Sequence, residues 1–398
     1  MKKLILKALI ILLCFFLFSC KKEDIAPTEI KSEENKTINT EAAVVEDVIK
    51  EVSFVACGDN ITYGTKDARS KAYEGGRALN FKPQYAEVAE KIESADIAFI
   101  NQECVMSDLH ALSYYPRFNV PRELGLDLIE LGYDVINVAT NHMLDKGADG
   151  LQSTIDFWKE QDVLMIGGYE NEEDFDKIRT LEKNGVTFAF LSYTYSTNGL
   201  TKDPSSPIVI PYIDDEDIRR QIYLARECAD FVFVSVHWGN EGAFTPSDEQ
   251  RRVASIMADA GADAIIGHHP HVLQPIEWID GSAGNKTLCV FSLGNFIAEQ
   301  EYAYNAVGGI VELKITQKND EKPIIEDVIF NPTVCHFSGD FYTNVVYYIE
   351  DYTEALASVH GVRTYYGNRI SLETLVEYAK TIDEDFLTKD VVEVFNSY

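Results

Sequence analysis

The stretch Ile265-Ile266-Gly267-His268-His269-Pro270-His271-Val272 carries the most informative pattern in this sequence. It places three of the protein's eight histidines within four positions. The apolar run that precedes them indicates a buried strand ending in a glycine turn. Neutral imidazole is a common ligand of divalent Zn, Mn or Fe. These histidines could instead make only local hydrogen bonds, so the choice depends on what the other strand ends supply.

Apolar runs alternate with helix-patterned segments over most of the chain. This alternation predicts an α/β fold in which polar residues gather at the C-terminal ends of the strands. The expected strands are Val52–Ala56, Ile97–Ile100, Val135–Val138, Val163–Ile166, Phe188–Leu191, Phe231–Val236, Ala264–Ile266 and Leu288–Phe291. The expected helices are Tyr85–Ser94, Arg122–Leu131, Gly150–Gln161, Glu216–Cys228 and Ser247–Ala260.

Carboxylates follow the first two expected strands. Asp59 comes after the glycine that ends the first strand, and Glu103 follows the second. A glycine at this position allows close backbone approach and leaves the carboxylate at the rim of the sheet. Taken singly, Asp59 could be a turn or helix cap, and Glu103 could be a surface residue.

An asparagine and a histidine follow the third expected strand. The amide of Asn141 can offer its oxygen to a metal or its nitrogen to a phosphate, and His142 can ligate a metal or act as an acid. Asp145 is spaced to orient His142 as a supporting carboxylate. It could equally cap the helix that begins soon after it.

Two later strands complete the set of polar strand ends. His237 follows one of them, with Glu241 close enough to join it, and Asn295 follows the other. Together the strand ends supply the mixed oxygen and nitrogen ligands of a dinuclear hydrolase site, in which two metals clamp a phosphate and activate water. Carboxylate and imidazole ligands favour Mn, Fe or Zn over Ca or Mg. Because the cysteines lie far apart, we do not expect a structural zinc site.

The N-terminus has the pattern of an export signal. A basic start precedes the apolar run Leu4–Phe18, which is short for a membrane-spanning helix. The sequence Leu17-Phe18-Ser19-Cys20 resembles the lipobox of bacterial lipoproteins, which implies a signal peptide over residues 1–20 and a lipid on Cys20. An uncleaved signal anchor is the alternative. In both cases we expect an exported protein held at the extracytoplasmic face of the cell membrane.

Composition divides the rest of the chain into three parts. Residues 21–50 are polar and charged and are expected to form a disordered tether, with a short helix possible at Glu41–Glu51. Residues 51–305 carry the α/β alternation. Residues 306–398 are expected to form a completing layer or a small appended unit, closed by a helical segment from about Leu372 to Phe395. The strands expected in this last part are Gly309–Thr316, Ile324–Phe330 and Val345–Ile349.

Charge and cysteine content limit the partners and the redox chemistry. The chain has 35 basic and 65 acidic residues, a formal net charge of −30. This balance argues against nucleic acid as a partner, because nucleic-acid binding needs a basic surface, and against close adsorption to anionic lipid heads. Cys57, Cys104, Cys228, Cys289 and Cys335 are expected to be mostly buried small hydrophobes, and export would permit one disulfide among them.

The polar motifs follow one another in a recognisable order. They are Gly58-Asp59, Asn101-x-Glu103, Asn141-His142-x-x-Asp145-x-Gly147, His237-Trp238-Gly239-x-Glu241, Gly267-His268-His269-Pro270-His271-Val272 and Ser292-Leu293-Gly294-Asn295-Phe296. This order, over about residues 53–300, resembles the CapA/PgsA family of capsule and poly-γ-glutamate synthesis proteins, which are related to the calcineurin-like metallophosphoesterases. The resemblance implies a four-layer α/β/β/α fold. It also implies a membrane-attached, metal-dependent hydrolase that takes part in making a polyanionic surface polymer.

The resemblance also assigns roles to residues. It implies that two divalent ions are held by Asp59, Glu103, Asn141, His237, His269 and His271. His142 would be the catalytic acid, steadied by Asp145, and His268, Glu241 and Asn295 are further candidates. The chain departs from the phosphoesterase pattern at Ile61, where that pattern has histidine, and by one extra residue in its last motif. The alternatives are a non-catalytic scaffold in a polymer synthesis and export complex, and a lipoprotein that binds a small solute.

Overall fold

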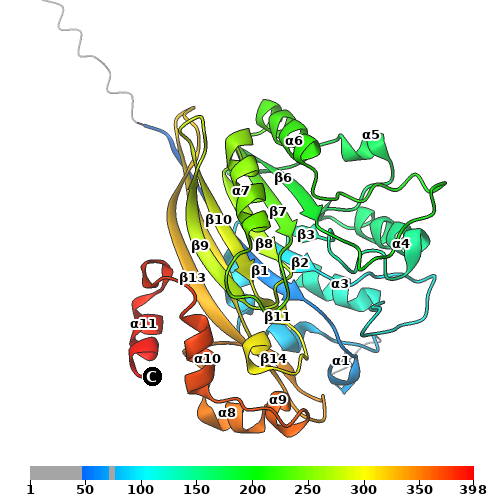
Figure 1. The fold of residues 1–398 in the computed structure, drawn as a ribbon, viewed down its shortest axis with the longest axis vertical. Coiled ribbons are helices and arrows are strands. Elements are labelled where there is room, and N and C mark those ends of the chain that lie inside the picture. Colours follow the sequence, from blue (N-terminus) through cyan, green and yellow to red (C-terminus); the bar gives the residue numbers. More distant parts are fainter. Residues whose placement is uncertain (1–46, 71–76) are drawn as a thin grey trace, which may run out of the picture. The chain divides into compact units, whose positions relative to one another are not determined.

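Two mixed β-sheets packed face to face form the centre of the protein (Figure 1). The structure is a computed structural model and describes residues 47–70 and 77–398. In spatial order, the first sheet contains β14 (Asn344–Tyr348), β13 (Ile324–Phe337), β12 (Val307–Lys318), β1 (Ile49–Asn60), β2 (Ile97–Gln102), β3 (Val135–Asn137) and β4 (Leu164–Ile166), with β11 (Asn295–Ile297) paired to β1. The second sheet contains β5 (Arg179–Lys183), β6 (Val186–Thr194), β7 (Phe231–His237), β8 (Ala264–His268), β10 (Lys286–Leu293) and β9 (Leu273–Asp280).

Helices cover the outer faces of both sheets. The first sheet packs against α2 (Ala89–Ser94), α3 (Arg122–Glu130) and α4 (Gly147–Lys159). The second sheet packs against α6 (Asp215–Cys228) and α7 (Asp248–Ala260). The shorter helices are α1 (Lys66–Ser70), α5 (Glu172–Phe175), α8 (Glu354–Val359), α9 (Gly361–Thr364), α10 (Leu372–Ala379) and α11 (Lys389–Asn396). The layers therefore follow the order α/β/β/α, as predicted.

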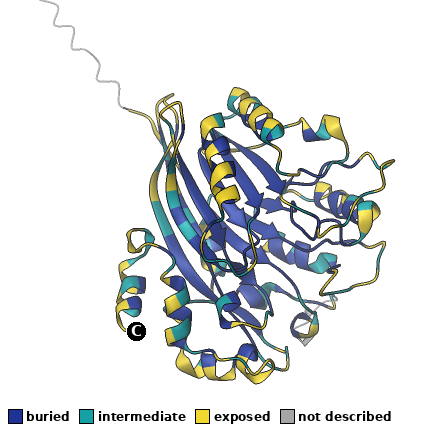
Figure 2. Ribbon diagram, in the orientation of Figure 1, coloured by how far each residue is buried: buried dark blue, intermediate teal, exposed yellow. Residues whose placement is uncertain are grey.

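Three hydrophobic cores separate these layers. Phe54 of β1 stacks on Phe233 of β7 between the two sheets, with ring centroids 4.2 Å apart. Val55, the next residue along β1, belongs instead to the core beneath α3 and α4. Because each central strand is buried on both faces, it appears in the sequence as a continuous apolar run. Figure 2 shows the central strands almost wholly buried, while the outer ends of the long strands and the outward surfaces of the helices are exposed.

Local signals fix the entry into β8, the strand that carries the crowded histidines. Ser247 and Gln250 form a reciprocal capping box at the start of α7. Gly261 ends that helix in the left-handed region, with φ of 104°. Asp263 then accepts hydrogen bonds from the backbone of Val232 (2.7 Å) and from Arg226 (2.8 Å), which joins the start of β8 to β7. The register of β8 is therefore fixed before the histidines are reached.

The last part of the chain adds to the first sheet. β12 pairs with β1 in antiparallel register, and β13 and β14 continue the same sheet outward. The helices α8 to α11 lie together at one end of the sheets (Figure 1). Residues 306–398 thus complete an existing layer and contain no separate sheet of their own among the described residues.

Several local predictions were wrong. Residues 49–60 are strand β1, so the tether does not reach residue 50, and the described part of Glu41–Glu51 is not a helix. The segment Tyr85–Ser94 is divided into a 3₁₀ turn at Lys82–Tyr85 and the short α2. The closing helical segment is two helices, α10 and α11, separated by a 3₁₀ turn at Glu384–Phe386. Asp383 and Thr388 each cap a new turn there, which interrupts the helix.

The export signal, Cys20 and most of the tether lie outside the described residues. Within the described ranges, no helix is long and apolar enough to cross a membrane. Cys57, Cys104, Cys289 and Cys335 are buried, Cys228 is exposed, and all of them are free thiols. These five described cysteines therefore form no disulfide with one another, and that possibility, left open by the sequence, is not realised.

Candidate metal centre

The C-terminal ends of strands from both sheets meet at one buried place. In the first sheet, β1 and β2 run parallel and end at Asp59 and Glu103. In the second, β7 and β8 run parallel and lead to His237 and His269. All four side chains are buried. Parallel strands bring their ends to the same edge, so face-to-face packing of the sheets brings the carboxylates to the imidazoles.

Glu103 lies between two histidines of the second sheet. Its Oε1 atom is 3.7 Å from Nε2 of His237 and 3.8 Å from Nε2 of His271. Neither carboxylate oxygen accepts a hydrogen bond from a described residue. The Nε2 atom of His237 is also 3.0 Å from Oδ1 of Asn141, so the predicted amide reaches the same point.

Asp59 is held by several polar groups. Asn101 donates to its Oδ1 at 2.7 Å, and the backbone N–H of His269 donates to its Oδ2 at 3.2 Å. The same Oδ2 lies 3.0 Å from Nδ1 of His271. Burial would raise the pKa of Asp59, but its contacts with His268 and His271 outweigh burial and hold that pKa well below its usual value. Asp59 is therefore an anion in this site.

The backbone of the turn after β8 gives His268 a different direction from His269 and His271. His269 and His271 both have left-handed backbone conformations, with φ of 96° and 54°. Side chains other than glycine rarely adopt this region, and such strain is concentrated at functional sites. The turn places both of these imidazoles beside Glu103, while His268 points elsewhere.

The donor set fits divalent cations. Two groups, Glu103 with His269 and His271, and Asp59 with Glu103 and His237, each have ligand atoms within 4.8 Å of one another. Burial lowers the pKa of His237 well below its usual value and lowers that of His269 to about 3, so both rings are neutral and able to ligate. Burial also raises the pKa of Glu103 well above its usual value, although the charge of His271 opposes this shift.

His142 and Asp145 form the predicted pair beside this centre. The Nδ1 atom of His142 is 2.7 Å from Oδ2 of Asp145, which also accepts the backbone N–H of Phe118 at 2.7 Å. The ring of Phe118 packs edge-on against His142, with centroids 4.8 Å apart. Asp145 thus orients the histidine and does not cap α4, whose N-cap residue is Lys146.

The three further candidates take different places. His268 packs in the core between the sheets, with its ring stacked on Phe99 and its Nδ1 3.4 Å from Asp59. Asn295 places its Oδ1 3.0 Å from Nδ1 of His271 and so orients that ring. Glu241 is exposed and lines a cavity that His271 also lines. None of the three belongs to the two ligand groups found among the described residues.

A supporting layer of polar side chains beneath Asp59 was not predicted from the sequence. Asn101 accepts a hydrogen bond from Asn137 (2.7 Å), and Ser192 of the second sheet donates to Asn137. Tyr195 was also not predicted as part of the site, and its ring centroid lies 4.6 Å from that of His269. Tyr195 directly follows β6, which extends to Thr194. The expected strand ended at Leu191, so the polar residues after its true end were not considered.

Ile61 occupies the position at which the phosphoesterase pattern has histidine. Its side chain is buried in the core on the helix-covered face of the first sheet. Its backbone N–H donates to Ile297 of β11 at 2.8 Å. The position therefore serves packing in this chain and supplies no ligand.

Comparison with known proteins places the chain in a group of capsule proteins. It is 38% identical over 187 residues to "PGA biosynthesis protein CapA" of Bacillus subtilis (strain 168), covering 46% of this chain and 48% of that protein. It is 34% identical over 204 residues to "Capsule biosynthesis protein CapA" of Bacillus anthracis, covering 50% of this chain and 48% of that protein. The chain thus spans about half the length of these curated relatives.

Solved structures give a more distant likeness. The crystal structure of calcineurin-like phosphoesterase YfkN from Bacillus subtilis matches with a TM-score of 0.43 and 14% identity, covering 72% of this chain and 91% of that one. A sequence model of one family matches residues 53–300, which hold all the motifs described above. The chain belongs to the bacterial capsule synthesis protein PGA_cap family.

Proposed function

We propose that this protein is a metal-dependent hydrolase of phosphoester type that acts in the biosynthesis of a capsule, poly-γ-glutamate or another surface polymer. The observation that carries this proposal is the position of Glu103, whose carboxylate belongs to both ligand groups and has no other hydrogen-bond partner among the described residues. A carboxylate shared between two groups suits a pair of divalent cations, Mn, Fe or Zn by the donor types. Bound there, such cations would place positive charge against a phosphate and lower the pKa of water.

Under this proposal one set of residues binds the cations and another supplies the proton. Asp59, Glu103, His237, His269 and His271 hold the cations, and Asn141 contributes an amide oxygen. His142 donates a proton to the leaving oxygen from the ring nitrogen that does not face Asp145. Asp145 fixes the orientation of that ring, as its 2.7 Å contact with Nδ1 supports.

Metal analysis and turnover together test this function. The full chain, purified without chelator, is expected to carry Mn, Fe or Zn and to hydrolyse p-nitrophenyl phosphate when metal is supplied. Dialysis against a chelator should abolish turnover, and restored metal should return it. If the purified chain contains no transition metal and hydrolyses nothing with any metal that is supplied, the hydrolase proposal is wrong.

A non-catalytic accessory role is the second candidate, and Ile61 favours it. This side chain packs in the core where the phosphoesterase pattern has a ligand, so the site offers one imidazole fewer. Stoichiometric metal without turnover of any phosphoester would support a scaffold in a polymer synthesis and export complex. Co-purification of the wild-type chain and a His142→Ala variant with the same membrane proteins would then be expected.

We further propose that the chain is attached to the extracytoplasmic face of the membrane through Cys20. The apolar run and lipobox-like sequence before this cysteine support the proposal. Cells grown with a labelled fatty acid should label the wild-type chain and not a Cys20→Ser variant. Labelling of both variants, or of neither, would contradict lipid attachment at this residue.

A further inference from the structure

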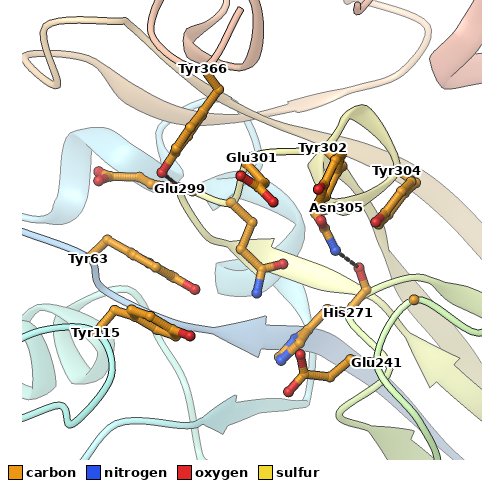
Figure 3. A pocket seen from close by; sticks show the side chains of 12 residues that line it. Tyr63, Tyr115, Glu241, His271, Glu299, Glu301, Tyr302, Tyr304, Asn305 and Tyr366 are labelled. Atoms are coloured by element: carbon orange, nitrogen blue, oxygen red, sulfur yellow. Dashed lines mark hydrogen bonds between the residues drawn. The ribbon is translucent and has the colours of Figure 1, made fainter. Parts of the chain in front are cut away.

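A cavity of ≈550 Å³ adjoins the candidate metal centre (Figure 3). His271 and Glu241 lie on the side next to the centre. Its other walls come from distant parts of the chain, including Tyr63 after β1, Tyr115 and the segment after β11. A substrate whose phosphate lay at the metal centre would therefore extend its remaining part into this cavity.

The lining of the cavity is rich in hydroxyl and carboxylate groups, and His271 is its only basic side chain among the described residues. Among the described residues that line it there are five tyrosines and three glutamates, and neither lysine nor arginine. A polycarboxylate entering here would meet carboxylates of the same sign at short range, which is unfavourable. The tyrosines and glutamates are Tyr63, Tyr115, Tyr302, Tyr304, Tyr366, Glu241, Glu299 and Glu301.

The tyrosine rings form parallel pairs. Tyr63 and Tyr115 have centroids 6.4 Å apart at an interplanar angle of 10°, and Tyr302 and Tyr304 lie 5.2 Å apart at 15°. An organic cation binds over the face of an aromatic ring, within about 6 Å of its centroid. Figure 3 shows instead that the hydroxyl ends of Tyr63 and Tyr115 point into the cavity. Phenol groups both donate and accept, so they suit a ligand that carries many hydroxyl groups.

One wall of the cavity is a rigid aromatic platform. Tyr304 packs against Phe244 and Tyr378, with ring centroids 6.1 Å and 6.0 Å away. Tyr302, which stacks on Tyr304, is 44% exposed. A fixed and partly exposed aromatic face can cover the apolar face of a sugar ring at little entropic cost.

We propose that this cavity binds the saccharide part of a phosphorylated sugar. The proposal rests on the proposed phosphoesterase function and adds the class of its substrate. The tyrosine hydroxyls and the carboxylate of Glu301 hydrogen-bond the sugar hydroxyls, and the exposed face of Tyr302 covers the ring or chain of carbons. The glutamates disfavour a substrate with a carboxylate in the same position.

Two linear sugar phosphates that differ only at the end remote from phosphate test the proposal. Sorbitol 6-phosphate ends in an alcohol and 6-phosphogluconate ends in a carboxylate. The wild-type full chain is expected to hydrolyse the first with a kcat/KM about tenfold or more above that for the second, because of like-charge repulsion in the cavity. Glu301→Gln should bring this ratio toward one, while Tyr223→Ala, an exposed tyrosine on α6, should leave it unchanged. Equal or better use of 6-phosphogluconate by the wild type would overturn the proposal.

A binding measurement separates this inference from the hydrolase proposal. Saturation-transfer NMR with the full chain should detect millimolar sorbitol and not gluconate, whether or not the protein hydrolyses p-nitrophenyl phosphate. Tyr302→Ala should abolish the sorbitol signal and Tyr223→Ala should keep it. No signal from sorbitol, an equal signal from gluconate, or a signal from choline in place of sorbitol would overturn the saccharide site.

Discussion

The Oε1 atom of Glu103 lies 3.8 Å from Nε2 of His271, and neither oxygen of this buried carboxylate accepts a hydrogen bond from a described residue. A buried carboxylate that accepts no hydrogen bond is costly, because its charge loses the solvation of water. Burial accordingly raises its pKa well above the usual value. Metal binding at Glu103 and the stability of the metal-free protein are therefore linked through this carboxyl group.

Glu103→Gln should weaken metal binding while leaving the metal-free protein at least as stable. The amide keeps the shape and removes the buried acid, but it is a poor ligand for a transition metal. We expect metal affinity to fall about 100-fold or more, since losing even a supporting partner costs about 10–100-fold. Metal content and urea unfolding with chelator present measure the two effects. Glu241→Gln, on the exposed carboxylate, is the control that should retain metal.

His142→Ala should keep the metal and lose turnover. General acid catalysis contributes roughly 10²–10⁴-fold, so kcat for p-nitrophenyl phosphate should fall by about that factor. Asp145→Asn should lower kcat less and should change its pH profile, because the ring keeps a polar neighbour but loses the carboxylate. Loss of metal in the His142→Ala protein would show that this histidine is a ligand and not the acid.

His268→Ala should mainly lower the free energy of unfolding, whereas His269→Ala should mainly lower the metal content, although the two residues are adjacent. His268 is wholly buried between the sheets on Phe99, so truncation leaves a cavity and should cost about 2–4 kcal/mol of unfolding free energy. His269 is a candidate ligand, so its loss should reduce metal content with a smaller change in the stability of the chelated protein. Urea unfolding and metal analysis of both variants check this. Similar behaviour of the two would contradict the division of roles.

The protein should lose stability as the pH falls from 6.5 toward 4, in part through His336 and His360. Burial lowers the pKa of His336 to about 4 and that of His360 to about 3. Since these pKa values lie below the value of an unfolded histidine, the stabilisation is present above pH 6.5 and is lost as the pH falls. Each group contributes a slope of up to about 1.4 kcal/mol per pH unit.

Urea unfolding of the chelated protein at pH 7 and pH 5 measures this dependence. His336→Gln should reduce the loss between the two pH values by about 2 kcal/mol, because one titrating group is removed. Tyr223→Ala, which changes an exposed tyrosine on α6, should leave the loss unchanged. An unaltered pH dependence in the His336→Gln protein would contradict the prediction.

The central strands could be predicted from the sequence because they are buried on both faces. β7 and β8 consist almost wholly of apolar residues, and short runs of this kind are typical of buried parallel strands in an α/β chain. The edge strands β5 and β9 were missed for the complementary reason. Arg179–Lys183 and Leu273–Asp280 carry charged or polar residues on an exposed face, so neither forms an apolar run.

The chemical groups available at the strand ends could be read from the order of residues alone. Asp59, Glu103, Asn141 and His237 were found there because the ends of parallel strands gather polar residues at one edge. The different positions of the three crowded histidines became clear only from the folded chain. His268 turns into the core between the sheets, while the left-handed backbone at His269 and His271 brings those two rings to Glu103. This division depends on backbone torsions and on the approach of two sheets, and the spacing of the residues specifies neither.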